Sequence, residues 1–129
     1  MSLITFDRAC GVYEFGFGLF HLGFPKLLRW GKELPKISKD NAGVMQILNL
    51  CLAFKFFWSA YIFWTCSEDL KWTKLGKSFK LGQAIFWSLR VVEQFVYLNV
   101  KHPVHQLLTI IFGSGVLLHG YNYKLHKGE

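Results

Sequence analysis

The stretch that decides the fold is GVMQILNLCLAFKFFWSAYIFWTC, residues 43–66. It is the most apolar and aromatic block of the chain, and Lys55 is its only charged residue. A helix of about twenty apolar residues is long enough to cross the roughly 30 Å hydrocarbon core of a bilayer. Residues 43–66 are therefore predicted to span a membrane.

Three more blocks of about twenty largely apolar residues flank this one, at 9–28, 81–100 and 103–121. The chain has 129 residues, of which 52% are hydrophobic, more than a soluble domain of this size could bury. The short turn 101–103 makes the last two blocks antiparallel neighbours, and Pro103 suits the first position of a helix. The sequence predicts one all-α membrane domain, a four-helix bundle running up-down-up-down.

The net charge of +7 comes largely from the connections. The first carries Lys26, Arg29, Lys32, Lys36 and Lys39, and the second carries Lys71, Lys74, Lys77 and Lys80. Because Trp30 and Trp72 lie beside these residues, both connections are predicted to meet anionic lipid headgroups, the second lying along the membrane surface. No nucleic-acid motif accompanies the charge, so no nucleic-acid partner is expected. Basic residues number seven on the face with the termini and six on the other, a difference of one charge that favours cytoplasmic termini and leaves insertion in both orientations as the alternative.

Polar residues inside the predicted spans point to a site. In span 9–28, Gly11, Glu14, Gly18, His21 and Pro25 are spaced 3, 4, 3 and 4 residues apart and share one helical stripe. The glycines should let another backbone approach closely, whereas Glu14 and His21 need partners. An ionisable residue within a span usually faces the bundle interior and has a function.

Two other spans carry polar groups. In span 81–100, Gln83, Trp87, Arg90, Gln94 and Tyr97 form a stripe, and Glu93 flanks it. Arg90 and Glu93 either only neutralise each other as an i,i+3 pair, or they line a polar site with Gln94 and Tyr97. In span 43–66, Asn49 lies on a polar stripe. Lys55 lies off that stripe, where it either meets a carboxylate or reaches along the lipid face.

Position along the alternating spans suggests one cluster. His21, Lys55, Arg90, Glu93 and Gln94 should lie near mid-membrane, with Glu14 nearer the terminal face. Two acids then balance two bases, as a low dielectric requires. The candidate residues for substrate binding or proton relay are Glu14, His21, Asn49, Lys55, Arg90, Glu93, Gln94 and Tyr97. His21 is the group best able to titrate near neutral pH.

Three runs of the sequence, FHLGFPKLLRW (20–30), NAGVMQILNL (41–50) and FWSLRVVEQFVYL (86–98), resemble small bacterial multi-span membrane proteins of unassigned function. The resemblance implies an integral protein of the bacterial inner membrane. It supplies no activity.

Four functions remain open at this point. The first is transport or binding of a small molecule or proton, by a homo-oligomer because four helices enclose little space. The second is a non-catalytic subunit of a larger membrane complex. The third is an enzyme acting on lipid, with His21 and Glu93 as acid and base. The fourth is a b-type haem protein, for which His21 with His105 is the conceivable ligand pair.

No other cofactor and no metal site is expected. The three cysteines, Cys10, Cys51 and Cys66, lack metal-ligand spacing, although a Cys10–Cys66 disulfide is conceivable.

Overall fold

The computed structural model describes residues 2–128, and this range is helical without strands. The long helices are α1 (Leu3–Leu22), α4 (Lys39–Thr65), α6 (Lys74–Tyr97) and α7 (Pro103–Lys124). The short ones are α2 (Phe24–Leu27), α3 (Trp30–Glu33), the 3-10 helix η1 (Leu34–Lys36) and α5 (Ser67–Trp72). The all-α class is confirmed, but the described chain has seven α-helices where four were expected.

The prediction for the first span, 9–28, extended it beyond the end of helix α1. Helix α1 stops at Leu22, Gly23 begins a new turn, and Pro25 lies in the first turn of α2. Arg29 then has a left-handed backbone with φ of 52°, which separates α2 from α3. Proline supplies no backbone N–H to continue a helix, so the chain breaks into short segments here.

The second connection is more helical than expected. Helix α6 begins at Lys74, where the Oγ1 atom of Thr73 accepts a hydrogen bond from the backbone N–H of Gly76 at 2.9 Å. A Cβ atom at Gly76 would lie 2.5 Å from the Cα atom of Leu70, so glycine permits the close approach of α5 to α6. Predicted span 81–100 is thus the later part of a helix that ends at Tyr97.

The starts of α4 and α7 follow from capping residues. Asn41 donates its backbone N–H to the Oγ atom of Ser38 at 3.3 Å, so Ser38 provides the cap. Helix α7 begins at Pro103 as predicted, and the ring Nδ1 atom of His102 accepts from the N–H of Val104 at 3.3 Å.

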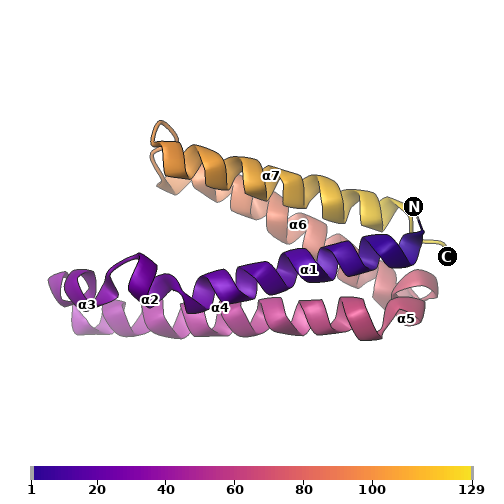
Figure 1. Cartoon of the computed structure of the whole chain (residues 1–129), viewed down its shortest axis with the longest axis horizontal. Coiled ribbons are helices and arrows are strands. Elements are labelled where there is room, and N and C mark those ends of the chain that lie inside the picture. The colour runs from indigo at the N-terminus through magenta and orange to yellow at the C-terminus, as the bar shows by residue number, and fades with distance from the viewer. Residues whose placement is uncertain (1, 129) are drawn as a thin grey trace. The chain divides into compact units, whose positions relative to one another are not determined.

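The chain divides into two compact units. One unit contains the chain up to Cys10 and from Cys66 onward, and the other contains residues 11–65. Within the first unit, α6 and α7 lie side by side, joined by a tight turn (Figure 1). Its core includes Trp87, whose ring lies 5.8 Å from that of Phe112 and 6.0 Å from that of His119.

In the second unit, large rings of α4 fill the glycine face of α1. A Cβ atom at Gly11 would lie 2.3 Å from the indole nitrogen of Trp64, and one at Gly18 would lie 2.7 Å from the ring of Phe57. The two glycines are seven residues apart in sequence, as are Phe57 and Trp64, so two successive ring-on-glycine contacts set the register of antiparallel packing. The glycines therefore accept aromatic side chains, where close backbone approach was expected.

Helices α6 and α7 bury polar residues and expose apolar ones. The buried stripe of α6 contains Gly76, Lys80, Gln83, Trp87 and Gln94, and that of α7 contains Phe112, Gly115, His119 and Asn122. On the other faces, Ile85, Val92 and Ile110 are exposed by 58%, 56% and 70%. By length and composition, α4 is the one helix of residues 2–128 that is apolar enough to cross a membrane.

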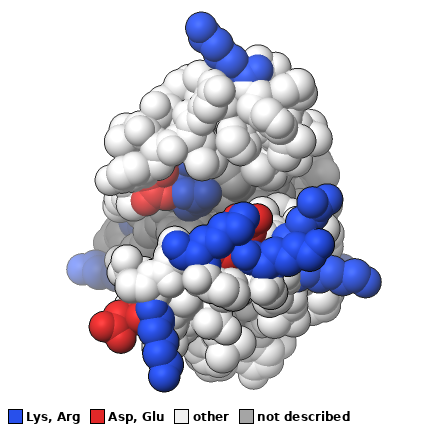
Figure 2. All heavy atoms as spheres, turned by 90° about the vertical axis from the view of Figure 1, so that its left-hand side faces the viewer, with Lys and Arg blue, Asp and Glu red and all other residues white. Residues whose placement is uncertain are grey.

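Basic side chains gather over α2, α3 and η1 (Figure 2). Lys26, Arg29, Lys32, Lys36 and Lys39 are all exposed. Trp30, expected beside the headgroups, is instead buried, with its ring 6.4 Å from that of Phe24.

Candidate functional site

A buried ion pair joins α1 and α4 in the second unit. The Nζ atom of Lys55 donates to the Oε2 atom of Glu14 at 3.0 Å. The Glu14 side chain is completely buried, and that of Lys55 is 30% exposed. Of the two alternatives for Lys55, the structure therefore shows the carboxylate partner, which lies 41 residues away in sequence.

His21 and Asn49 form a reciprocal contact in the same unit. The Nδ2 atom of Asn49 donates to the backbone carbonyl of His21 at 2.9 Å, so its Oδ1 atom faces the His21 ring, 2.8 Å from Nδ1. The His21 carbonyl is available because Pro25, four residues later, has no N–H to donate. An amide oxygen can only accept, so the neutral His21 ring carries its proton on Nδ1.

Aromatic rings surround His21. The His21 ring centroid lies 4.2 Å from that of Phe24 and 5.2 Å from that of Phe56. The Lys55 ammonium also lies 4.8 Å from the centroid of Phe56. An aromatic ring face attracts cations, so this environment tolerates a charged imidazolium.

The residues predicted on α6 do not form one site. Arg90 pairs with Glu93 within the helix, as the i,i+3 spacing predicted, and its guanidinium lies 4.8 Å from the ring centroid of Phe112. Gln94 is buried and donates to the carbonyl of His105 at 3.3 Å and to Thr109 Oγ1 at 3.4 Å. Tyr97 is 79% exposed, so it does not line a polar interior with Gln94.

A third ion pair, which the sequence reasoning missed, is buried in the first unit. The Nζ atom of Lys80 lies 2.9 Å from Asp7 Oδ1 and donates to Asn122 Oδ1 at 3.3 Å. Asn122 Nδ2 in turn donates to Asp7 Oδ1 at 2.9 Å. The three side chains close a triangle that links α1, α6 and α7, and each residue is at most 1% exposed.

A signal for this triangle was present in the sequence. Lys80 precedes Gln83 and Trp87 at spacings of 3 and 4, so it extends the polar stripe of α6 by one turn. It was assigned to the membrane surface because three other lysines precede it in the connection. The structure corrects that assignment, since Lys80 is buried.

The histidines of α7 donate hydrogen bonds to backbone carbonyls. The ring Nδ1 atom of His105 donates to the carbonyl of Asn99, and that of His119 donates to the carbonyl of Gly115, both at 2.9 Å. Cys10, Cys51 and Cys66 are free thiols, so the conceivable Cys10–Cys66 disulfide is not formed. Within residues 2–128, no group of three His, Cys, Asp or Glu side chains is placed to hold a metal ion.

Comparisons with known proteins found no relative of this chain. No protein-family model matches the chain, and neither the curated proteins nor the solved structures contain a significant match.

Proposed function

We propose that this chain is an integral membrane protein whose long helices α1, α4, α6 and α7 all cross the bilayer. Its buried polar groups bind a proton or a small polar solute during transport. The observation that carries the proposal is the polarity of α1, α6 and α7, which bury charged and amide side chains and expose many of their apolar ones.

Helix α6 illustrates this polarity. Lys80, Gln83 and Gln94 are buried, whereas Ile85, Leu89 and Val92 are more than half exposed. In water, so much exposed apolar surface would cost free energy in proportion to its area, about 25 cal/mol per Å². In lipid the same surface is compatible with its surroundings, and the polar groups are correctly placed inside.

Helix α4 does not resemble the core helix of a soluble protein. Only 28% of the most apolar 18-residue stretch of α4 is buried. Leu50, Phe54 and Trp58, which follow one another at spacings of four, are exposed by 64%, 67% and 53%. A continuous apolar stripe of this kind suits contact with acyl chains.

The charged groups are paired, as a low-dielectric interior requires. Asp7 faces Lys80 and Glu14 faces Lys55, each pair joining two helices. Arg90 and Glu93 pair within α6. Because the pairs are neutral, they make insertion tolerable, and we assign the change of charge to His21, since histidine is the side chain whose charge can change near neutral pH.

His21 is the proposed proton carrier. Since Nδ1 donates to Asn49, Nε2 is the nitrogen that takes up a second proton, and the imidazolium formed is stabilised by the faces of Phe24 and Phe56. Asn49 holds the ring in one orientation through the carbonyl that Pro25 leaves available. Uptake on one side of the membrane and release on the other would move a proton.

The basic connections are proposed to contact anionic headgroups of the bacterial inner membrane. Five exposed basic residues surround α2, α3 and η1, and Lys71 lies 4.7 Å from the ring of Trp72, which is 53% exposed. Both termini are proposed to be cytoplasmic. The working form is proposed to be a homo-oligomer, because a few helices enclose little space for a solute.

Proton flux into liposomes tests this function. The purified protein is reconstituted with an internal pH dye, and a pH gradient is imposed. Unmodified protein should dissipate the gradient faster than empty liposomes, and His21→Gln should reduce the excess rate at least tenfold. His102→Gln is the matched control, because His102 is exposed in the turn before α7 and should leave the rate unchanged.

Two outcomes would contradict the proposal. Equal rates for His21→Gln and the unmodified protein would exclude His21 as the carrier. Purification from its host together with other membrane chains in fixed ratio, with no flux from the chain alone, would favour the alternative of a non-catalytic subunit.

A further inference from the structure

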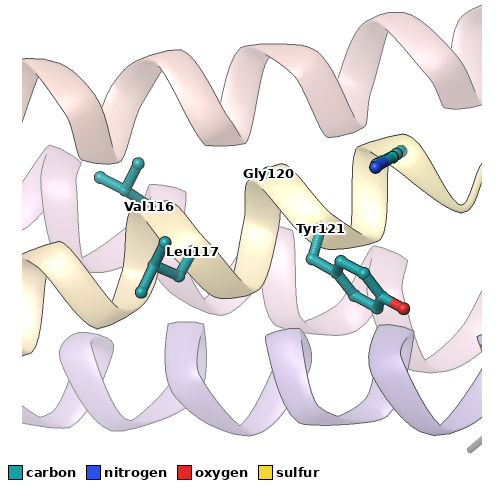
Figure 3. A pocket seen from close by; sticks show the side chains of 5 residues that line it. Val116, Leu117, Gly120 and Tyr121 are labelled. Atoms are coloured by element: carbon teal, nitrogen blue, oxygen red, sulfur yellow. The ribbon is translucent and has the colours of Figure 1, made fainter.

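An open groove runs along the surface of α7. Its volume is about 460 Å³, and it is lined by Val116, Leu117, Gly120, Tyr121 and Lys124. Figure 3 shows Gly120 between Leu117 and Tyr121 along α7, and as a glycine it has no side chain there. A Cβ atom built at Gly120 would meet nothing within 4 Å, so the protein itself leaves this space open.

We propose that this groove is a binding site for one acyl chain of an anionic phospholipid, with the phosphate held by Lys124. The inference rests on the membrane placement proposed above. The lining changes from the aliphatic side chains of Val116 and Leu117, through the phenol of Tyr121, to one ammonium group at the end of α7. That order matches an amphiphile with an apolar tail and a negatively charged head.

The dimensions suit part of one acyl chain. Val116 to Lys124 spans eight residues, about 12 Å along a helix. Leu117 is 76% exposed and Tyr121 is 49% exposed, so both are open to lipid from the side. Tyrosine and lysine near a helix end commonly mark the level of the headgroups.

Lys124, and not the apolar lining, should provide the selectivity. Lipid tails are already in an apolar solvent, so an acyl chain gains only packing contacts when it enters the groove. A lysine at the headgroup level attracts an anionic lipid by about 1 kcal/mol, which is about fivefold in affinity. The site should therefore distinguish headgroups much more than tails.

Native mass spectrometry of the full chain in detergent can count bound lipids and measure each affinity. Phosphatidylglycerol and phosphatidylcholine with identical tails are the probes. The first phosphatidylglycerol should bind about fivefold more tightly than the first phosphatidylcholine. Lys124→Gln should reduce this preference, whereas Lys101→Gln, which removes an exposed lysine at the other end of α7 and outside both basic connections, should preserve it.

Filling the groove with a side chain provides a second test of the lipid site. Gly120→Leu should abolish the tight binding event without affecting folding, because a side chain there has room. Gly113→Leu is the control, since it adds the same atoms to α7 at another open position that does not line the groove.

Each contrary result overturns the lipid site. Equal affinity for the two lipids, or equal effects of Gly113→Leu and Gly120→Leu, would show ordinary contact with the lipid annulus. Loss of dimers in Gly120→Leu with unchanged lipid binding would show that a second copy occupies the groove. A chain that stays dissolved without detergent would instead refute the membrane placement itself.

Discussion

The buried pair of Asp7 and Lys80 provides the sharpest test of the structure. Asp7→Asn removes the negative charge but almost no volume, and it leaves the Lys80 ammonium in a site that is 1% exposed. At the observed 2.9 Å, two unit charges attract by about 6 kcal/mol at an effective dielectric constant of 20. Measured losses on breaking buried pairs are about 3–5 kcal/mol. We expect Asp7→Asn to lower the free energy of unfolding by an amount in this range.

The assay is unfolding by SDS in mixed micelles, followed by circular dichroism. The double replacement Asp7→Asn with Lys80→Met removes the stranded charge, so it should recover most of the loss. Glu33→Gln is the control, because Glu33 pairs with Lys36 at the same 2.9 Å but with both side chains more than half exposed. An exposed pair contributes about 0–1 kcal/mol. The reasoning is refuted if Asp7→Asn costs no more than Glu33→Gln, or if the double variant is less stable than Asp7→Asn.

Four further expectations use the same unfolding assay or site-specific tags. Gly76→Ala should destabilise the chain strongly, since its Cβ would lie 2.5 Å from backbone atoms of α5, whereas Gly82→Ala, with open space around it, should be neutral or stabilising by up to about 1 kcal/mol. Asn49→Leu should lower the free energy of unfolding by about 1–3 kcal/mol for each polar group of His21 whose hydrogen bond to Asn49 it removes. An unchanged midpoint of SDS unfolding would exclude the described contact. Arg90→Leu combined with Glu93→Leu should be at least as stable as the unmodified chain and more stable than Arg90→Leu alone, because removing both charges of this pair, whose side chains are 29% and 33% exposed, also removes the cost of placing them in lipid. Accessibility tags at residues 4 and 126 should report the same side of the membrane, and opposite sides would rule out four spans.

Much of the local structure could be predicted from the sequence. Apolar block length located the long helices, and Pro103 marked the first residue of α7. Arg90 and Glu93 pair as their spacing predicted. These features depend on residues within a few positions of one another, so helical geometry is enough to predict them. Two boundaries differed: Gly23 and Pro25 together ended α1 sooner than apolar length suggested, and α6 began at Lys74, before the apolar block.

The contacts between helices could not be obtained this way. Lys55 pairs with Glu14, which is 41 residues away in sequence, and Lys80 pairs with Asp7, which is even farther away in sequence. The spacing of Lys80 to Gln83 and Trp87 placed it on the polar stripe of α6, but this spacing did not show that the stripe is buried at Lys80, which lies in one lysine-rich run with the exposed Lys74. Which lysine turns inward depends on how far each helix is rotated and shifted against its neighbours. Side-chain packing over the whole interface sets that rotation and shift, as when Trp64 and Phe57 meet Gly11 and Gly18, and only the tertiary structure contains this information.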